Sequence, residues 1–166
     1  KAVLDELDAR KDIGHIYCAG DMIGIGPYSN EVLTLLFSRN DVSMVTGNHD
    51  EAILSLIENE EYPTSHNDSK EHHQWIAKHL DRSYTPALKK LPRIIREDIE
   101  GQSILVTHYH IEPSKLLDPI SLDPFSKIVE PTTDNMVSLF KDYEANLILF
   151  GHHHPMHFFK NNRTIY

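Results

Sequence analysis

The side chains best suited to chemistry in this sequence are carboxylates, carboxamides and imidazoles that follow short apolar runs. They are Asp21, Asn48, His49, His108, His110, His152, His153 and His154. A short apolar run bounded by turn residues predicts a buried strand. Because open α/β folds bind their ligands at the carboxyl edge of the sheet, we expect these side chains to converge at one edge.

Carboxylate, carboxamide and imidazole groups without a thiolate form a borderline-hard set of metal ligands. Such a set suits Mn, Fe, Zn, Co or Ni better than a structural zinc site. Asp21 precedes a glycine-rich loop, and its two oxygens could bridge a pair of cations about 3.5 to 4 Å apart. His152 and His154 could both reach nearby metals while His153 points elsewhere. Taken singly, each residue is also an ordinary turn or strand-end residue, and it is their joint order that favours a metal centre.

Alternating strands and helices must position these side chains in the first part of the chain. The expected strands cover His15 to Ala19 and Val42 to Val45, and the expected helices cover Ser29 or Asn30 to Phe37 and Glu51 to Ile57. The turn Gly47 to Asp50 joins the second strand to its helix. Two units of this kind favour a layered α/β fold with parallel strands in its core.

The rest of the chain mixes loops, helices and a hairpin. The polar stretch Asn59 to Lys70 predicts a flexible loop, and the proline-containing stretch His108 to Thr132 predicts a long one. Further helices are expected at Glu71 to Leu80, Thr85 to Leu91 and Thr133 or Asp134 to Tyr143. Further strands are expected at Pro92 to Glu97, Gln102 to Thr107, Asn146 to Phe150, Met156 to Lys160 and Thr164 to Tyr166. The first two of these strands form a hairpin through Glu100-Gly101, which introduces antiparallel pairing.

Composition limits the partners that this chain could have. A formal net charge of -9 disfavours a nucleic-acid-coating surface, which needs clustered Lys and Arg. The apolar runs are far shorter than the roughly 20 residues that span a bilayer, so no membrane partner is expected. The single Cys18 lies in an apolar run and is interpreted as a packing residue in a cytoplasmic protein. Histidines outside the strand ends, among them His66, His72 and His73, are interpreted as surface or structural residues.

The order of the motifs is similar to that of a known family. The patterns GD-x-x-G at Gly20 to Gly24, GNHD at Gly47 to Asp50, T-H at Thr107-His108 and GH-x-H at Gly151 to His154 resemble those of the calcineurin-like metallophosphoesterases. The stretch Gly20 to Pro27 further resembles the small bacterial and archaeal phosphodiesterases of that superfamily. The resemblance implies an α/β fold of the layered αββα sandwich type with mixed sheets.

The resemblance also implies a set of metal ligands. The Asp matching Asp21 bridges two divalent metal ions, of which manganese is favoured here. The residues matching Asn48, His108 and His152 complete the second metal site, and the one matching His154 binds the first metal. The expected cofactor is therefore a pair of divalent ions.

The resemblance gives the turn Gly47 to Asp50 a part in the chemistry. The residue matching His49 contacts the phosphate and is the candidate general acid for the leaving group. Asp50 is a possible second-shell residue that would orient His49.

The sequence departs from the family pattern at both ends. The family begins with a strand ending in D-x-H, which supplies the other ligands of the first metal, whereas Lys1 to Leu7 resembles the helix that follows that strand. The family also continues beyond the segment that ends at Tyr166. We therefore expect a single metallophosphoesterase domain over residues 1–166, incomplete at both ends.

The expected function is hydrolysis of a small phosphate ester by two-metal activation of a bridging water. A phosphodiester is favoured, with a phosphomonoester or a nucleotide as other substrates, and the loops Asn59 to Lys70 and His108 to Thr132 are expected to flank the cleft. The alternatives are a non-catalytic scaffold and a metal-binding regulator of the same fold. The sequence predicts no oligomeric state.

Overall fold

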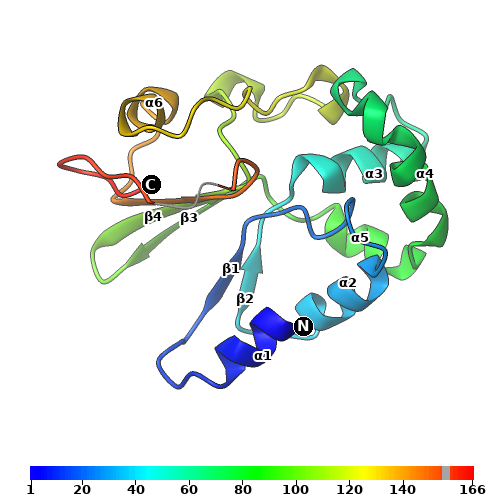
Figure 1. Cartoon of the computed structure of the whole chain (residues 1–166), viewed down its shortest axis with the longest axis horizontal. Coiled ribbons are helices and arrows are strands. Elements are labelled where there is room, and N and C mark those ends of the chain that lie inside the picture. The colour runs from blue at the N-terminus through cyan, green and yellow to red at the C-terminus, as the bar shows by residue number, and fades with distance from the viewer. Residues whose placement is uncertain (155–157) are drawn as a thin grey trace.

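A computed structural model of the chain describes residues 1–154 and 158–166 and has an α/β architecture (Figure 1). The α-helices are α1 (Ala2–Asp8), α2 (Ser29–Phe37), α3 (Asn48–Glu58), α4 (Lys70–His79), α5 (Thr85–Leu88) and α6 (Thr133–Leu139). Short 3-10 helices are η1 (Thr64–Ser69), η2 (Arg82–Tyr84), η3 (Pro113–Lys115) and η4 (Ile120–Leu122). None of the helices in these two ranges is long and apolar enough to cross a membrane.

The strands form two sheets. Strands β1 (Ile16–Cys18) and β2 (Val42–Met44) pair in parallel, with Ile16 opposite Val42. Strands β3 (Ile94–Ile99), β4 (Gln102–Thr107) and β5 (Leu147–Phe150) form the second sheet in that order. Strands β3 and β4 are antiparallel, whereas β4 and β5 are parallel. The predicted α/β class with mixed strand directions and the predicted hairpin are therefore confirmed.

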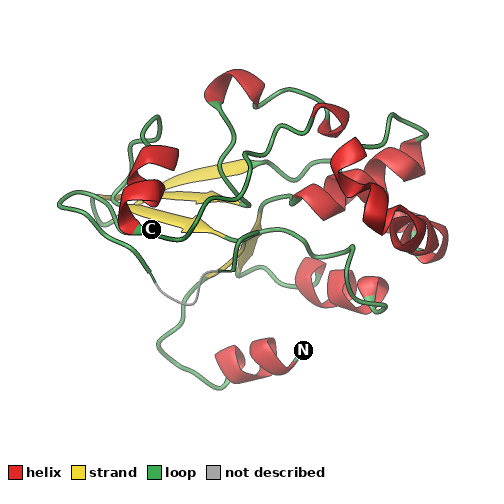
Figure 2. Ribbon diagram, turned by 45° about the horizontal axis from the view of Figure 1, so that its top comes forward, coloured by secondary structure: helices red, strands yellow, loops and turns green. Residues whose placement is uncertain are grey.

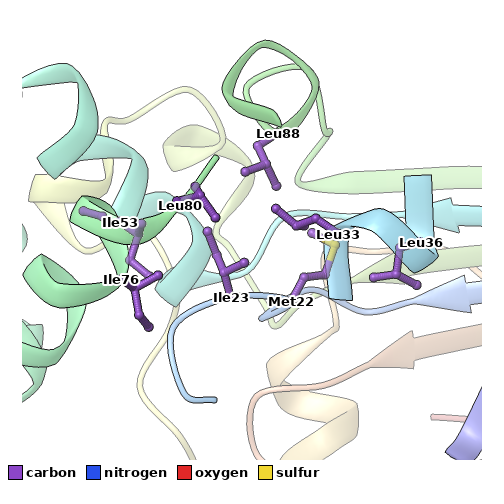
Figure 3. Close-up of a cluster of buried hydrophobic side chains, with 9 residues drawn as sticks. Met22, Ile23, Leu33, Leu36, Ile53, Ile76, Leu80 and Leu88 are labelled. Carbon is purple, nitrogen blue, oxygen red and sulfur yellow. The ribbon is translucent and has the colours of Figure 1, made fainter. Parts of the chain in front are cut away.

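Two apolar clusters hold the helices against the sheets. Helices α2 to α5 enclose the first cluster (Figure 3), in which Leu33, Ile53 and Ile76 are almost completely buried. Helix α6 packs on the three-stranded sheet, where Leu105, Met136 and Ile148 form the centre of the second cluster. The helices thus cover different sheets, and the segment between β4 and α6 runs across the top of the molecule (Figure 2).

Direct hydrogen bonds join the two sheets at their carboxyl ends. The Thr46 N–H donates to the Pro92 carbonyl at 3.0 Å, and the His108 ring donates to the Ala19 carbonyl at 2.7 Å. At the side of the same junction, the Tyr17 hydroxyl donates to Glu97. The turns that follow β1, β2, β4 and β5 therefore meet at this junction.

Several elements differ from the sequence-based expectation. Helix α3 begins at Asn48 rather than Glu51, because the Asp50 carboxylate accepts the Gly47 N–H at 2.9 Å and so caps the first turn. The stretch expected to be a flexible loop contains η1, which packs against α4. Helix α6 ends at Leu139, four residues before the predicted end at Tyr143.

The last predicted strands are present only as isolated bridges in the described part. Lys160 forms an antiparallel bridge to Ile165, and Ile165 forms a parallel bridge to Leu147. The first two residues of the strand predicted from Met156 lie outside the described residues, as does Pro155.

Candidate metal centre

Four turns, each following a strand, carry the residues that form the centre. Asp21 follows β1, Asn48 follows β2, His108 follows β4 and His152 follows β5. Asn48 and His108 are only 4% and 1% exposed. Asp21 and His152 have positive φ angles of 54° and 58°, a conformation that costs free energy in residues other than glycine. Backbone strain of this kind is concentrated at functional sites.

The ligand-type atoms of these four side chains converge on one point. His108 Nε2 lies 2.7 Å from Asn48 Oδ1 and 3.1 Å from His152 Nδ1. It lies 3.3 Å from Asp21 Oδ2. His152 Nδ1 is also 2.9 Å from Asn48 Oδ1. Ligand atoms of Asp21, His108 and His152 all lie within 4.8 Å of one another, as in a site that could hold a metal ion.

The hydrogen bond from His108 to Ala19 determines which ring nitrogen of His108 carries the proton. A carbonyl oxygen can only accept, so His108 Nδ1 carries the proton in the 2.7 Å bond to the Ala19 carbonyl. In the neutral ring, Nε2 then presents a lone pair to Asn48 Oδ1 and Asp21 Oδ2. Unpaired acceptors crowded in a buried space repel one another unless a cation lies between them. The donor set therefore fits a divalent metal ion.

The pKa values of His108 and Asp21 shift toward their ionised forms, whereas that of His152 shifts toward the neutral form. Burial lowers the pKa of His108, but the hydrogen bond and charge of Asp21 outweigh it, so the pKa is raised overall. Burial raises the pKa of Asp21, but the hydrogen bond and charge of His108 outweigh it and lower that pKa. Burial, followed by the charge of His108, lowers the pKa of His152 to about 4, so the His152 ring is neutral at neutral pH.

Close backbone contacts hold the carboxylate in place. A Cβ atom on Gly47 would lie 2.2 Å from Asp21 Oδ1, so only glycine lets these two turns approach each other. Below them, the two oxygens of Asp50 accept the main-chain N–H groups of Ile23 and Gly47, each at 2.9 Å. Burial raises the pKa of Asp50 to about 7. Asp50 therefore ties the turn after β1 to the turn after β2.

His49 lies beside the centre, and its main chain and its ring contact different residues. Its main-chain N–H donates to Asp21 Oδ1 at 3.1 Å, and its ring Nδ1 lies 2.9 Å from His73 Nε2. Both oxygens of Asp50 are engaged by main-chain groups, so the orienting effect of Asp50 on the His49 ring remains a prediction.

Two histidines that the sequence-based interpretation assigned to surface or structural roles contact the predicted site. His66 Nε2 lies 2.6 Å from Asn48 Nδ2, and His73 is fully buried against His49. The structural role assigned to His73 is therefore incomplete. One signal was available, because His73 shares the buried face of its helix with Ile76 and Ala77 at the i+3 and i+4 positions. His66 lies in an aperiodic segment that gave no such signal.

Three of the histidines expected at the sheet edge do not join this centre. His110 packs against Phe140 and Tyr143, and it lines a separate cavity of about 640 Å³. His153 lies with its ring against that of Tyr109. His154 is exposed and belongs to no metal-ligand group found within residues 1–154 and 158–166, so its role as a ligand of the first metal stays a prediction.

A cavity of about 610 Å³ opens next to the centre. Asn48, His49 and His152 form one side of it. The segments at residues 65–69 and 120–128 form the rest and include Phe125 and Lys127. Both loops that were expected to flank a cleft thus contribute to this cavity.

Comparisons with known proteins agree with the fold and the motifs. A model of the calcineurin-like phosphoesterase superfamily domain matches residues 1–166. An uncharacterized protein of Methanocaldococcus jannaschii is 33% identical over 107 residues, which are 64% of this chain and 42% of that protein. The chain thus spans less than half the length of this relative.

Two solved structures share the fold at low sequence identity. A hypothetical protein from Pyrococcus horikoshii superposes with a TM-score of 0.65 at 17% identity, over 90% of this chain and 60% of that one. A metallophosphoesterase from Sphaerobacter thermophilus superposes with a TM-score of 0.62 at 20% identity, over 92% of this chain and 55% of that one.

Proposed function

Because this chain belongs to the calcineurin-like phosphoesterase superfamily, we propose that it is a metal-dependent hydrolase of small phosphate esters, with phosphodiesters favoured over phosphomonoesters and nucleotides. The observation that carries the proposal is the convergence of ligand-type atoms from Asp21, Asn48, His108 and His152 at one partly buried point. Two imidazole nitrogens, a carboxamide oxygen and a carboxylate oxygen at one point form a ligand set that suits a divalent ion.

The proposed cofactor is a pair of divalent ions, with manganese favoured. Asp21, Asn48, His108 and His152 would hold one ion, and Asp21 and His154 would contribute to the other. Bound ions of this kind neutralise the phosphoryl oxygens and lower the pKa of water. The chain itself supplies the ligands, the close approach of its turns and the cavity that receives the ester.

His49 is the proposed general acid. It lines the cavity beside Asn48 and His152, where the leaving oxygen of a bound ester would need a proton. Burial lowers the pKa of His49, and the Asp21 carboxylate acts in the opposite direction. The lowered pKa makes the protonated His49 ring a stronger acid toward the leaving oxygen and leaves a smaller share of the ring protonated at neutral pH.

The cavity walls are proposed to select the ester groups. Phe125 and Ile128 offer apolar surface, and Lys127 is a positive charge in the same segment. An ester with an apolar or aromatic group beside its phosphate would match this lining. The segment 120–128 is therefore the proposed specificity element.

The test compares metal binding with hydrolysis in the same preparation. The protein is stripped with a chelator and titrated with Mn²⁺ by calorimetry. It is then assayed with bis(4-nitrophenyl) phosphate and with 4-nitrophenyl phosphate. The proposal expects Mn²⁺-dependent hydrolysis with the diester preferred. Metal binding without turnover of either ester would favour a regulator, and neither binding nor turnover would favour a scaffold.

A further inference from the structure

A chain of hydrogen bonds leads away from the His49 ring into the protein. His49 Nδ1 lies 2.9 Å from His73 Nε2, and His73 Nδ1 lies 2.8 Å from the Tyr62 hydroxyl. That hydroxyl lies 3.0 Å from the main-chain carbonyl of His66. This series of hydrogen bonds thus begins at the proposed general acid and ends at a carbonyl oxygen, which can only accept.

The terminal carbonyl sets the direction of every bond in this chain. A carbonyl oxygen can only accept, so the single hydroxyl proton of Tyr62 points to it. The Tyr62 oxygen then accepts from His73 Nδ1, which must carry a proton. In a neutral His73 ring, Nε2 holds a lone pair and accepts from His49 Nδ1.

The surroundings of His73 keep its ring neutral. Its side chain is fully buried in helix α4. Burial and then the neighbouring ring of His49 lower the pKa of His73 to about 4. At neutral pH the ring of His73 is therefore neutral, and it donates to Tyr62 and accepts from His49.

We propose that His73, held by Tyr62, is a positioning residue that fixes His49 in the tautomer with its proton on Nδ1. The other ring nitrogen, Nε2, is then the atom that exchanges a proton with the ester. No hydrogen-bond partner of His49 Nε2 occurs among residues 1–154 and 158–166, which is consistent with its being left for a ligand. The catalytic consequence rests on the proposed function, whereas the tautomer does not.

Other groups near the His49 ring do not compete for its Nδ1 atom. The nearby carboxylate of Asp50 is engaged by two main-chain N–H groups. On the other side lies Gly24, where an added Cβ would come within 2.5 Å of His49 Cβ. Residue 24 therefore has no side chain that could reach the His49 ring, and the acceptor that faces Nδ1 lies on α4.

The first experiment measures the tautomer without any assay of activity. Long-range ¹H–¹⁵N correlation spectra of ¹⁵N-histidine-labelled full chain distinguish a protonated from an unprotonated ring nitrogen. His49 is assigned from the spectrum of His49→Gln. The expected result is a protonated Nδ1 in the wild type, retained in His73→Gln, whose amide oxygen can accept, and lost in part in His73→Phe.

Tyr62→Phe provides a second variant with minimal change in volume. Without the hydroxyl acceptor, the proton of His73 is no longer held on Nδ1 and can move to Nε2. His49 Nδ1 must then accept, so the share of His49 with its proton on Nε2 should rise. His79→Phe is the matched control on the same helix, since His79 is exposed and its Nδ1 bonds the Trp75 carbonyl at 2.7 Å. A wild-type His49 protonated on Nε2, or a His49 spectrum that is the same in all variants, would overturn the proposal.

The second experiment uses the leaving group. For a phosphodiester with an alkyl leaving group, kcat of His73→Phe should fall about 10- to 100-fold, the range seen when the hydrogen-bond partner that orients a metal-site histidine is removed. For a 4-nitrophenolate leaving group, which needs no proton, kcat should fall much less. His73→Gln should recover most of the loss, with KM and manganese content unchanged.

The two experiments separate this proposal from the proposed function. If the wild type shows the Nδ1 tautomer but hydrolyses no ester, the positioning stands and the phosphoesterase function is wrong. If the wild type hydrolyses both esters and His73→Phe loses equal activity on each, His73 does not act through the acid and its positioning role is overturned.

Discussion

Asp21 is the carboxylate among the four residues of the centre. Its carboxylate lies 3.3 Å from His108 Nε2 and accepts the main-chain N–H of His49. Asp21→Asn keeps the shape but removes the charge that a cation requires. We expect this variant to lose nearly all bound manganese, measured by elemental analysis, and nearly all turnover. Asp5→Asn, on an exposed position of α1, is the control and should keep both.

The loop after β1 contains a matched pair of glycines. Gly24 has a φ of +120°, and a Cβ there would meet His49 Cβ at 2.5 Å, whereas nothing lies within 4 Å of a Cβ on Gly26. Gly24→Ala should therefore displace His49 and lower turnover about 10- to 100-fold. It should also cost about 1 to 3 kcal/mol of unfolding free energy.

The control for this substitution is Gly26→Ala, which should change unfolding free energy by less than about 0.5 kcal/mol. Urea denaturation and steady-state kinetics on both variants give the comparison. Equal effects of the two substitutions would show that the loop is sensitive to any added side chain, and not to contact with His49.

At the scale of single residues, the motifs located the centre but not the histidines that contact it, His66 and His73. Asp21, Asn48, His108 and His152 each follow a strand, so a local pattern was enough to select them, and the structure brings them together. His66 and His73 act through contacts with residues 18 and 24 positions away. A contact of that range depends on how α3 and α4 pack, which no short pattern records.

At the scale of elements, the start of α3 depends on one buried carboxylate. Asp50 accepts N–H groups from Ile23 and Gly47, and both donors would be left unpaired in Asp50→Ala. Each of the two unpaired buried groups costs about 1 to 3 kcal/mol, so we expect a loss of about 2 to 6 kcal/mol in unfolding free energy. Asp50→Asn keeps one acceptor and should lose less.

The control for Asp50 is another acidic residue in the first turn of a helix. Glu31 occupies that position in α2 and is exposed. Glu31→Ala removes only its interaction with the helix dipole and should cost less than about 1 kcal/mol. A similar loss in both variants, measured by urea denaturation, would mean that Asp50 acts as an ordinary first-turn acid.

Elements with a strong period were easier to predict than the segments that shape the cavity. The hairpin of β3 and β4 was predicted within two residues because turn residues separate two alternating runs. The segment that contains η1 was predicted to be a flexible loop because it is polar. Its order comes from hydrogen bonds of Tyr62 to His73 and of Ser65 to Asp123, which composition does not reveal.

At the scale of the whole molecule, buried histidine makes stability depend on pH. The pKa of His73 is lowered from its usual 6.5 to about 4 in the folded chain. Between these values the unfolded chain binds a proton that the folded chain does not, so stability is kept above pH 6.5 and lost as pH falls toward 4. The loss is on the order of 3 kcal/mol.

The measurement for this prediction is urea denaturation at a series of pH values. The slope of unfolding free energy against pH should be smaller in His73→Gln, which has no titratable group at this position. His79→Gln is the control and should keep the wild-type slope. Identical slopes in all three proteins would place the acid sensitivity in other groups.

Metal binding should stabilise the whole fold, because the centre joins both sheets. The sheets contact each other through His108 and Ala19 and through Thr46 and Pro92. Manganese at about 100 times its Kd should add about 2.7 kcal/mol to the unfolding free energy. Thermal unfolding with and without manganese tests this, and Asp21→Asn should show no shift.

The dispersal of the ligands along the chain also bears on how the molecule folds. The four proposed ligands follow β1, β2, β4 and β5, so no local segment contains the centre. Contacts between residues far apart in the sequence form late in folding, because the entropy cost of closing the intervening loops must be met first. An ion can therefore bind only after both sheets have met. It should prolong the lifetime of the folded chain by slowing unfolding, while the rate of folding stays the same.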